Sequence, residues 1–354
     1  MAVSIANADM RVLCIAPETS VRAHLPGVDV RYVDIPLNKR LLRQWTTFAH
    51  AVDKHMHHVS AQSFWAADLW SLRAAVRAAS LCNATVLYDS REIYSALAEL
   101  HKRPFMQLCV SIMESLYVRK ADRVCVSGEL DAEVLRRILK LSRQPDVILN
   151  VPSYTAPTAS QRLRERCQIP AGDFIVVYQG AVLEGRGIEL LMDAMEFAPR
   201  MHACIIGEGP SFNRYAQYAD TKEWSERLHM IGSVPNHELA LWTASADVGF
   251  CCIEPLTLSY ELALPHKLFE YAMAGLPVCL SDLPAMRRVI EQYPFGECIA
   301  TDSTPAACAS VLQQLVLKRD VYRPQALAAA KVFNRERQEE RIVRMAKEMV
   351  GRHD

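Results

Sequence analysis

The sequence predicts an α/β protein with two doubly wound domains, each built on a parallel sheet. The chain has 354 residues, of which 51% are hydrophobic and 23% are charged, a length and composition that suit two globular domains. Short apolar runs rich in β-branched residues alternate with longer helical patterns, which is typical of βαβ units. The alternation occurs in two series of similar length, so we expect two similar domains.

In the first series, four apolar runs predict strands, at residues 11–16, 28–33, 84–88 and 123–126. Helical periodicity predicts helices over 66–81 and 107–119, between the later strands. The pattern begins at the stretch MRVLCIAP, so we expect residues 1–9 to be a disordered extension, and Met10 is a candidate natural start.

The second series follows the stretch VILNVPSY, where Pro152 and Pro157 break the pattern and predict a linker. Five further strands are expected, at 174–180, 202–210, 228–234, 246–253 and 277–282, with helices between them that include 188–198 and 237–244. The last stretch, 324–350, predicts one long amphipathic helix with a solvated charged face. Two such domains imply a cleft between the carboxyl ends of their strands.

The composition argues against several classes of protein. Forty basic and forty acidic side chains give a formal net charge of zero, which provides no footprint for nucleic acid. Eleven cysteines without any C-x-x-C suggest neither a zinc framework nor a disulfide scaffold. The cluster HMHH, His55 to His58, lacks acidic or cysteine partners, so we expect no metal. With neither a leader nor a membrane span in the sequence, we expect a cytoplasmic protein.

A glycine-rich turn stands in the stretch YQGAVLEGRGIELL, residues 178–191. Its glycines let the backbone approach a ligand, and a helix start nearby favours an anion. Arg186 adds a fixed positive charge whose planar fork suits phosphate oxygens. A plain βα turn with a solvated arginine is the alternative, because the spacing matches neither a Walker loop nor a G-x-G-x-x-G motif.

A second polar pair lies in the stretch LPHKLFEYAMAGLPV, residues 264–278. Pro265 suits a first helical position and Gly275 ends the helix, so Lys267 and Glu270 lie on one face near its start. One interpretation is a surface ion pair. The other is that Lys267 and the helix start receive phosphate, while Glu270 accepts hydrogen bonds from sugar hydroxyls.

Together the stretches GAVLEGRG, IGEGP, IGSVP and PHKLFEYAMAGLPV, in this order, resemble the nucleotide-sugar domain of the family 4 glycosyltransferases, which have the GT-B fold. The resemblance extends over VLYDSREIY and ILNVP to nearly the whole chain. It implies an acceptor-binding Rossmann-like domain over 10–152, a nucleotide-sugar domain over 172–325, and a helix over 326–354 that crosses back to the first domain. It also implies transfer with retention, without an active-site metal or any cofactor, from a UDP- or GDP-sugar donor.

The resemblance assigns roles to individual residues of the second domain. Arg186 matches the second basic residue of the family, which holds the donor diphosphate. Glu270 matches a glutamate that binds the donor ribose, and Gly180 matches a glycine that lets the diphosphate approach. The remaining positions of the expected donor site are Gly207, Val234, Lys267 and Leu268.

The sequence departs from the family pattern at two positions. Ala181 stands where the family has its first basic residue, usually an arginine directly after the glycine that Gly180 matches. Leu262 stands where the family has its first glutamate, with Glu261 and Glu254 nearby. We expect the charge of Lys267 to replace the one that Ala181 lacks, so that Arg186 and Lys267 act together on the leaving diphosphate.

In the first domain, the stretch DSREIY places Asp89, Arg91 and Glu92 directly after a predicted strand. Many relatives have a histidine where Arg91 stands, and Arg91 and Glu92 are our candidates for catalytic residues on the acceptor side. A salt-bridged loop is the alternative. Asp68 also resembles a family loop position.

The prediction is therefore a glycosyltransferase that acts on a glycan, lipid-linked or small-molecule acceptor in cell-surface polysaccharide or glycoconjugate synthesis. The alternatives are a sugar-nucleotide epimerase of the same fold, which needs carboxylates and a histidine for elimination, and a non-catalytic sugar-nucleotide-binding subunit. Peripheral membrane contact through LNKRLLRQWTTF, residues 37–48, is one interpretation of that stretch, and a core-facing stripe is the other.

Overall fold

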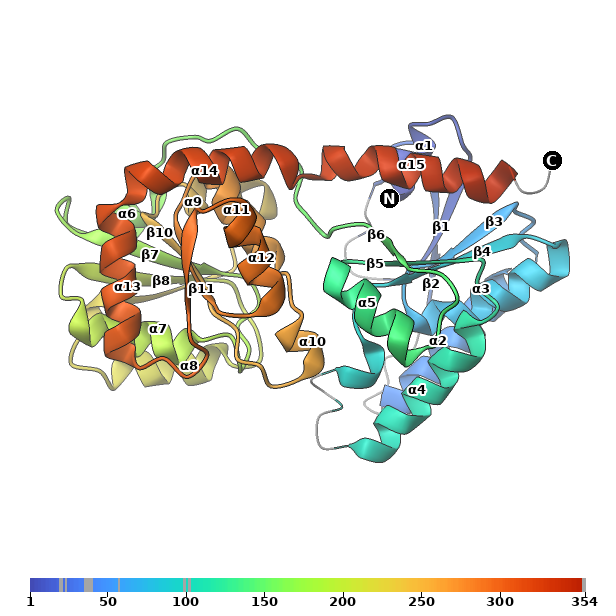
Figure 1. Cartoon of the computed structure of the whole chain (residues 1–354), viewed down its shortest axis with the longest axis horizontal. Coiled ribbons are helices and arrows are strands. Elements are labelled where there is room, and N and C mark those ends of the chain that lie inside the picture. Colours follow the sequence, from blue (N-terminus) through green and yellow to red (C-terminus); the bar gives the residue numbers. More distant parts are fainter. Residues whose placement is uncertain are drawn as a thin grey trace. The chain divides into compact units, whose positions relative to one another are not determined.

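The computed structural model describes residues 1–18, 22, 24–34, 41–56, 58–97, 100 and 103–351, without the side chains of 41–46. The chain divides into two compact units (Figure 1). Unit 1 comprises Met1–Leu149 together with the chain from Glu336 onward, and unit 2 comprises Asn150–Arg335.

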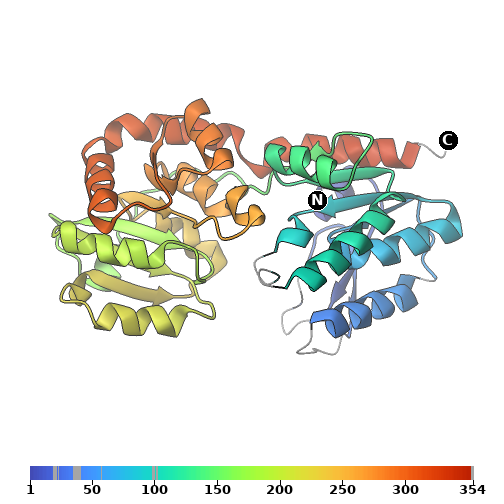
Figure 2. The same ribbon diagram turned by 60° about the horizontal axis from the view of Figure 1, so that its bottom comes forward.

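Unit 1 is built on parallel strands, as the alternating pattern predicts. Strand β1 (Val12–Pro17) pairs with β2 (Val28–Val33), and a second sheet has the order β3 (Ser63–Ala66), β4 (Thr85–Ser90), β5 (Arg123–Val126), β6 (Asp146–Val147). Its longer helices are α2 (Leu41–Met56), α3 (Leu69–Cys82), α4 (Pro104–Val118) and α5 (Glu129–Ile138). Helix α3 packs against both α2 and α4 (Figure 2).

The helix predicted from residue 66 begins later, because a short strand precedes it. Ala66 ends β3, and Asp68 forms the N-cap of α3, where its Oδ1 accepts a hydrogen bond of 2.8 Å from the Ser71 amide. The Ser71 hydroxyl completes a capping box with Asp68. Asp68 thus has a structural role at the helix start.

The prediction that residues 1–9 are disordered is wrong. Ala2–Ala6 form helix α1, in which Ser4 is buried and donates a hydrogen bond of 3.0 Å to Glu339. Glu339 belongs to α15 (Arg335–Val350), whose side chains Ile342, Met345 and Met349 form a core cluster with unit 1 strands, and Met1 and Ile5 pack against that cluster. This packing stabilises a helix whose own sequence is too short to be stable alone.

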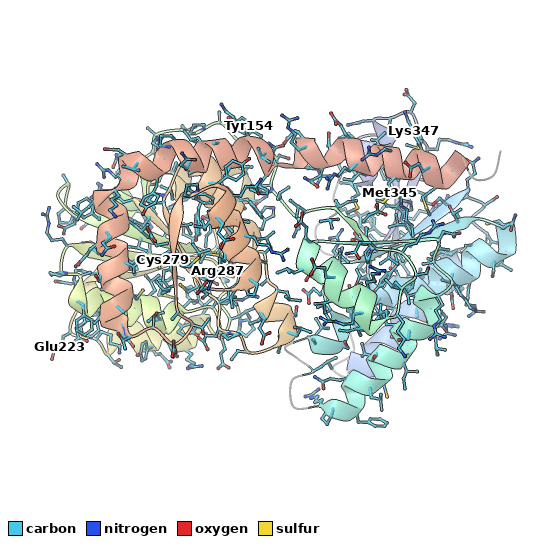
Figure 3. The ribbon with its side chains drawn as sticks, in the orientation of Figure 1. Tyr154, Glu223, Cys279, Arg287, Met345 and Lys347 are labelled. Atoms are coloured by element: carbon cyan, nitrogen blue, oxygen red, sulfur yellow. The ribbon has the colours of Figure 1, made fainter. Side chains whose placement is uncertain are left out.

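Helix α15 packs on unit 1 through one apolar stripe. Met345 lies on its buried side, while Lys347 is exposed (Figure 3). The expected contact between the last helix and the first domain is therefore present.

The single helix predicted over 324–350 is in fact two helices, α14 (Arg319–Val332) and α15. Between them Phe333 leaves the helical conformation, with φ −91° and ψ 70°, and its ring packs 5.2 Å from that of Phe269 and 5.6 Å from that of Tyr293. The Asn334 side chain donates to the Ala330 carbonyl and so closes the first helix. Pro324 lies inside α14.

Unit 2 contains a six-stranded parallel sheet. Its strands are β7 (Phe174–Gln179), β8 (Met201–Ile206), β9 (Leu228–Gly232), β10 (Val248–Cys251), β11 (Val278–Ser281) and β12 (Gly296–Ile299), in the order β12-β11-β10-β7-β8-β9. The sequence of strands reverses direction between β7 and β10. In doubly wound sheets, ligands bind beyond the carboxyl ends of the strands at such a switch point.

Helices cover both faces of this sheet (Figure 1). On one face, the core contains side chains of α7 (Ile188–Ala194), α8 (Phe212–Asp220) and α13 (Pro305–Leu317). On the other, it contains side chains of α6 (Arg162–Cys167), α9 (Leu239–Thr243), α11 (His266–Ala274), α12 (Pro284–Gln292) and α14. The short helix α10 (Leu258–Glu261) precedes α11.

Candidate active site

Three glycine turns join the loops that follow β7, β8 and β9. The Gly180 amide donates a hydrogen bond of 3.0 Å to the Ile206 carbonyl, and the Gly207 amide donates one of 2.8 Å to the Gly232 carbonyl. Gly207 has φ +131°, and a Cβ built there would lie 2.0 Å from the Gly180 carbonyl oxygen. Only glycine fits at residue 207. Because glycine has no Cβ, the backbone of these turns is also open to a close approach by a ligand.

Lys267, in the first turn of α11, points toward the first of these turns. Its Nζ lies 3.5 Å from the centroid of the Tyr178 ring, and a Cβ built on Gly180 would lie 3.9 Å from that Nζ. The residue is only 9% exposed. Burial lowers the pKa of Lys267 to about 8, and the positive charge of Arg186 also acts to lower it. Lys267 is therefore a buried cation directly beside Gly180.

Arg186 lies between Gly185 and Gly187, which have φ +74° and +67°. Its guanidinium carbon lies 4.6 Å from the centroid of the Tyr260 ring, in α10. In the part of the chain that the structure describes, neither Arg186 nor Lys267 makes an ion pair, and an aromatic ring lies against each. The charge of Glu270 acts on Lys267 without an ion pair, so these two cations retain positive charge that an anion can bind.

Glu270 does not pair with Lys267, so the surface ion pair considered for these residues is absent. Its Oε1 lies 2.9 Å from His266 Nδ1, and its Oε2 accepts a hydrogen bond of 2.5 Å from Gln179 Nε2. The Thr243 hydroxyl in turn donates to Gln179 Oε1 over 2.6 Å. The carboxylate is held by this network, while its side chain remains 23% exposed.

A cavity of about 370 Å³ opens beside this network. Gln179, Thr243, His266 and Glu270 line it together with the stretch that begins at Asn150. Gln179 directly follows Tyr178 in β7, and Glu270 lies three residues after Lys267 in α11. Neither Lys267 nor Arg186 lines the cavity itself. Its size is that of a small-molecule site.

The two departures from the family pattern, Ala181 and Leu262, have different surroundings, and Ala181 is exposed. Leu262 is buried at the end of α10, and Glu261 beside it is exposed. Glu254 is exposed as well, but its amide donates a hydrogen bond of 2.9 Å to the Gly185 carbonyl, which anchors it at the Arg186 loop. Burial raises the pKa of Glu254, with smaller contributions from the charges of two other glutamates.

Two further positions of the expected donor site, Val234 and Leu268, have side chains that pack in or against the core. Val234 is half-buried in the loop after β9 and packs against the core. Leu268 is fully buried, and its amide donates to the Pro265 carbonyl. The role of Leu268 in a donor site stays a prediction, and its side chain has a packing role.

In unit 1, the expected polar residues follow β4. Arg91 Nε lies 3.1 Å from Asp89 Oδ2, so the salt-bridged loop exists. The Ser127 hydroxyl donates to the Arg91 carbonyl, and the Ser90 hydroxyl donates to the Glu92 carbonyl. Arg91 and Glu92 remain exposed, and their catalytic role stays a prediction.

Sequence reasoning missed several polar residues. In unit 2 these are Gln179, Thr243 and His266, of which Gln179 had a detectable signal, since it directly precedes Gly180 at the end of a strand. In unit 1, Glu114 is 1% exposed and accepts a hydrogen bond of 2.7 Å from the Tyr88 hydroxyl. Burial raises the pKa of Glu114 to about 7. A carboxyl within the apolar sequence of α4 was its signal.

The residues that the structure describes include neither a cluster that would hold a metal ion nor a helix that could cross a membrane. Within them, no group of three or more His, Cys, Asp or Glu side chains is arranged to hold a metal ion, and His57 of the HMHH cluster lies outside them. No helix described there has the length and apolar character needed to cross a bilayer. Of the stretch 37–48, residues 37–40 and the side chains of 41–46 lie outside the described part.

Known proteins match both the sequence and the fold. The profile of the family "Glycosyl transferases group 1" matches residues 159–331, which include the Gly180 turn, Arg186, Lys267 and Glu270. The chain belongs to the group 1 glycosyltransferase family. It is a nucleotide-sugar-dependent glycosyltransferase of the family 4 type, as the resemblance predicts.

One curated relative of this glycosyltransferase is phosphatidyl-myo-inositol mannosyltransferase of Mycobacterium leprae, 23% identical over 81% of this chain and 70% of the relative. Among solved structures, sucrose-phosphate synthase from Thermosynechococcus elongatus matches with a TM-score of 0.81 and 17% identity, over 99% of this chain and 92% of that one. HepE from Anabaena, in complex with UDP, matches with a TM-score of 0.72 and 13% identity, over 96% and 100%. These structures show that the fold is GT-B.

Proposed function

We propose that unit 2 binds a nucleoside-diphosphate-sugar donor through the residues around Gly180. Arg186 and Lys267 hold the diphosphate, Glu270 accepts hydrogen bonds from the ribose hydroxyls, and the adjoining cavity takes the nucleoside. The observation that carries this proposal is the pair of cations without an ion-pair partner, at the switch point of the sheet. A diphosphate supplies the negative charge that these side chains lack.

The cations contribute most when the donor's glycosidic bond breaks. The bond between the anomeric carbon and the diphosphate oxygen breaks and leaves its electron pair on that oxygen. The acceptor hydroxyl oxygen forms the new bond on the same face and passes its proton to the departing diphosphate. Negative charge develops on the departing diphosphate, where Arg186 and Lys267 stabilise it. Because Lys267 Nζ lies beside Gly180, directly before Ala181, it supplies the charge that the alanine does not.

Unit 1 is proposed to bind the acceptor, a glycan or a lipid-linked molecule of cell-surface polysaccharide or glycoconjugate synthesis. This assignment is supported by Arg91 and Glu92, two exposed residues that follow the carboxyl end of β4. Ligands of parallel sheets bind at that end of the strands. Work at the inner face of a membrane, by peripheral contact, is part of this proposal. UDP-sugars are the first donors to test, since HepE is similar in fold and its structure contains UDP-glucose.

The test is a thermal-shift panel with UDP-, GDP-, ADP- and CMP-sugars, followed by product analysis with the donor that stabilises the protein. A donor at 100 times its dissociation constant adds about 2.7 kcal/mol of stability. Transfer of the sugar to an acceptor or to water supports the proposal. An epimerised donor would identify the epimerase, and binding without either reaction would identify a non-catalytic subunit.

A paired set of variants then tests the site itself. Arg186→Gln combined with Lys267→Met is expected to abolish the shift by the donor. Arg200→Gln is the matched control. Arg200 is an exposed arginine directly before β8, at the amino ends of the strands and therefore at the opposite end of the sheet from the proposed site. Equal donor shifts in both variants would refute the assignment of the diphosphate site.

A further inference from the structure

Helix α4 of unit 1 carries a stripe of large apolar side chains exposed to solvent. Phe105 is 74% exposed, Leu108 56%, Ile112 52% and Leu116 60%. Their spacing of three, four and four residues places them on one face of the helix. Isolated exposed apolar residues are ordinary, but four on one helix face form a continuous patch that marks an interaction surface.

The opposite side of α4 already packs on the core of unit 1. Val110, Glu114 and Val118 are almost fully buried there. The exposed stripe is therefore additional to the apolar surface that the fold needs from this helix. Figure 1 shows α4 at the margin of its unit, with α3 packed on its inner side.

Positive charges lie at both ends of this stripe. Arg103 precedes the helix, and Arg119 and Lys120 follow it. All three are exposed, and none forms an ion pair with another residue that the structure describes. The one acidic side chain of α4, Glu114, faces inward. The outward surface thus combines apolar side chains with unpaired cations.

We propose that this face of α4, Phe105 to Leu116 with its flanking cations, docks on an anionic lipid surface. The apolar side chains enter the boundary between headgroups and acyl chains while the cations contact the headgroups, as for other interfacial helices. A second copy of the chain fits less well, since either orientation of two paired α4 helices brings Arg103 against Arg103 or against Arg119 and Lys120. The docking deepens the membrane part of the proposed function and is independent of the donor site.

The experiment is cosedimentation of the full chain with vesicles of equal parts phosphatidylglycerol and phosphatidylcholine, compared with phosphatidylcholine alone. We expect binding to the anionic vesicles and at least about tenfold weaker binding to the neutral ones. Replacing Ile112→Asp and Leu116→Asp together should weaken binding to the anionic vesicles by at least about tenfold, because charges then enter the apolar contact.

A matched control is available in unit 2. Leu317 and Val321 are also four residues apart and are 84% and 70% exposed, and Leu317→Asp with Val321→Asp should leave vesicle binding unchanged. Replacing Arg119→Glu and Lys120→Glu should remove the preference for anionic lipid. The donor thermal shift of every variant verifies that it is folded and reads the donor site separately from docking.

Three results would overturn the proposal. They are equal binding to neutral and anionic vesicles, unchanged binding of the Ile112→Asp, Leu116→Asp variant, and a dimer in light scattering that this variant converts to a monomer. The last result would identify a second copy of the chain as the occupant of the stripe.

Discussion

The two units treat their loop cations in opposite ways. In unit 1, Arg91 follows a strand and pairs with Asp89, whose side chain is 7% exposed. In unit 2, Arg186 and Lys267 follow or face a strand end and have aromatic rings beside them instead of carboxylates. Arg91 already has a carboxylate partner before any ligand binds, whereas Arg186 and Lys267 have no ion-pair partner among the residues that the structure describes.

This difference indicates where ligand charge is needed. Burial disfavours the charged form of Lys267, as its pKa of about 8 shows. An arriving diphosphate removes that penalty, so the unpaired cations gain more from binding than Arg91 can. The comparison predicts a ranking of effects, with Lys267 first and Arg91 last.

The largest effect is expected for Lys267→Met. The variant loses one preorganised positive charge, so kcat/KM for sugar transfer should fall by roughly 10²- to 10³-fold. The melting temperature should hold or rise, because an apolar side chain replaces a buried charge that has no ion-pair partner. Unchanged turnover would remove Lys267 from the site and with it the contrast between the units.

A smaller loss is expected for Glu270→Gln. Hydrogen bonds to a charged group are worth about 1.5 to 3 kcal/mol, so donor affinity should fall roughly 10- to 100-fold. Isothermal titration with the donor, and with the free nucleoside diphosphate, measures this loss. A variant that binds both as tightly as the parent protein would exclude Glu270 as the ribose ligand.

Glu261→Gln and Glu254→Gln serve as controls for this measurement. Both glutamates are exposed, but Glu254 is anchored to the Gly185 carbonyl. A loss of turnover confined to Glu254→Gln would identify it as the substitute for the glutamate missing at Leu262, and a loss confined to Glu261→Gln would favour Glu261.

Donor affinity should also depend on pH. Lys267 is protonated below its pKa of about 8 and neutral above it, while the donor diphosphate keeps its charge in this range. The affinity of the parent protein should therefore fall as the pH rises through 8, by roughly tenfold at one unit above the pKa. In Lys267→Met this pH dependence should disappear, and its persistence there would assign the titration to another group.

The smallest effect on activity is expected for Arg91→Ala. Arg91 is 59% exposed but its partner Asp89 is only 7% exposed, so removing Arg91 should lower the free energy of unfolding by about 1 to 3 kcal/mol. Donor affinity should be unchanged, and turnover should fall less than about tenfold. A loss of turnover as large as that of Lys267→Met would make Arg91 a full partner in catalysis and end the distinction between the units.

The sequence predicted the parallel sheets, the glycine turns and the positions of the two cations, because these depend on local spacing. Strands β3 and β12 were missed because their sequences, SFWA and GECI, lack the run of β-branched residues that marks the predicted strands. The break between α14 and α15 was also missed, because the packing of Phe333 on Phe269 and Tyr293 produces it and no glycine or proline marks it.

In the site, the i, i+3 spacing placed Lys267 and Glu270 on one helix face but did not give their partners. Glu270 pairs with His266 and with Gln179, a residue 91 positions away in the sequence. Such long-range contacts depend on how α11 packs on β7, which spacing alone does not specify.

The hydrogen bonds from Gly180 to Ile206 and from Gly207 to Gly232 extend the sheet beyond its strands. Because these backbone contacts join the loops, a substitution that moves one loop should also move the loop bonded to it. A side chain at residue 207 would push the Gly180 carbonyl, which belongs to the turn beside Lys267. In a library of variants with altered donor preference, acceptable changes should therefore cluster at the exposed residues of the cavity wall, such as Asn236 and Ala240, rather than in the joined loops.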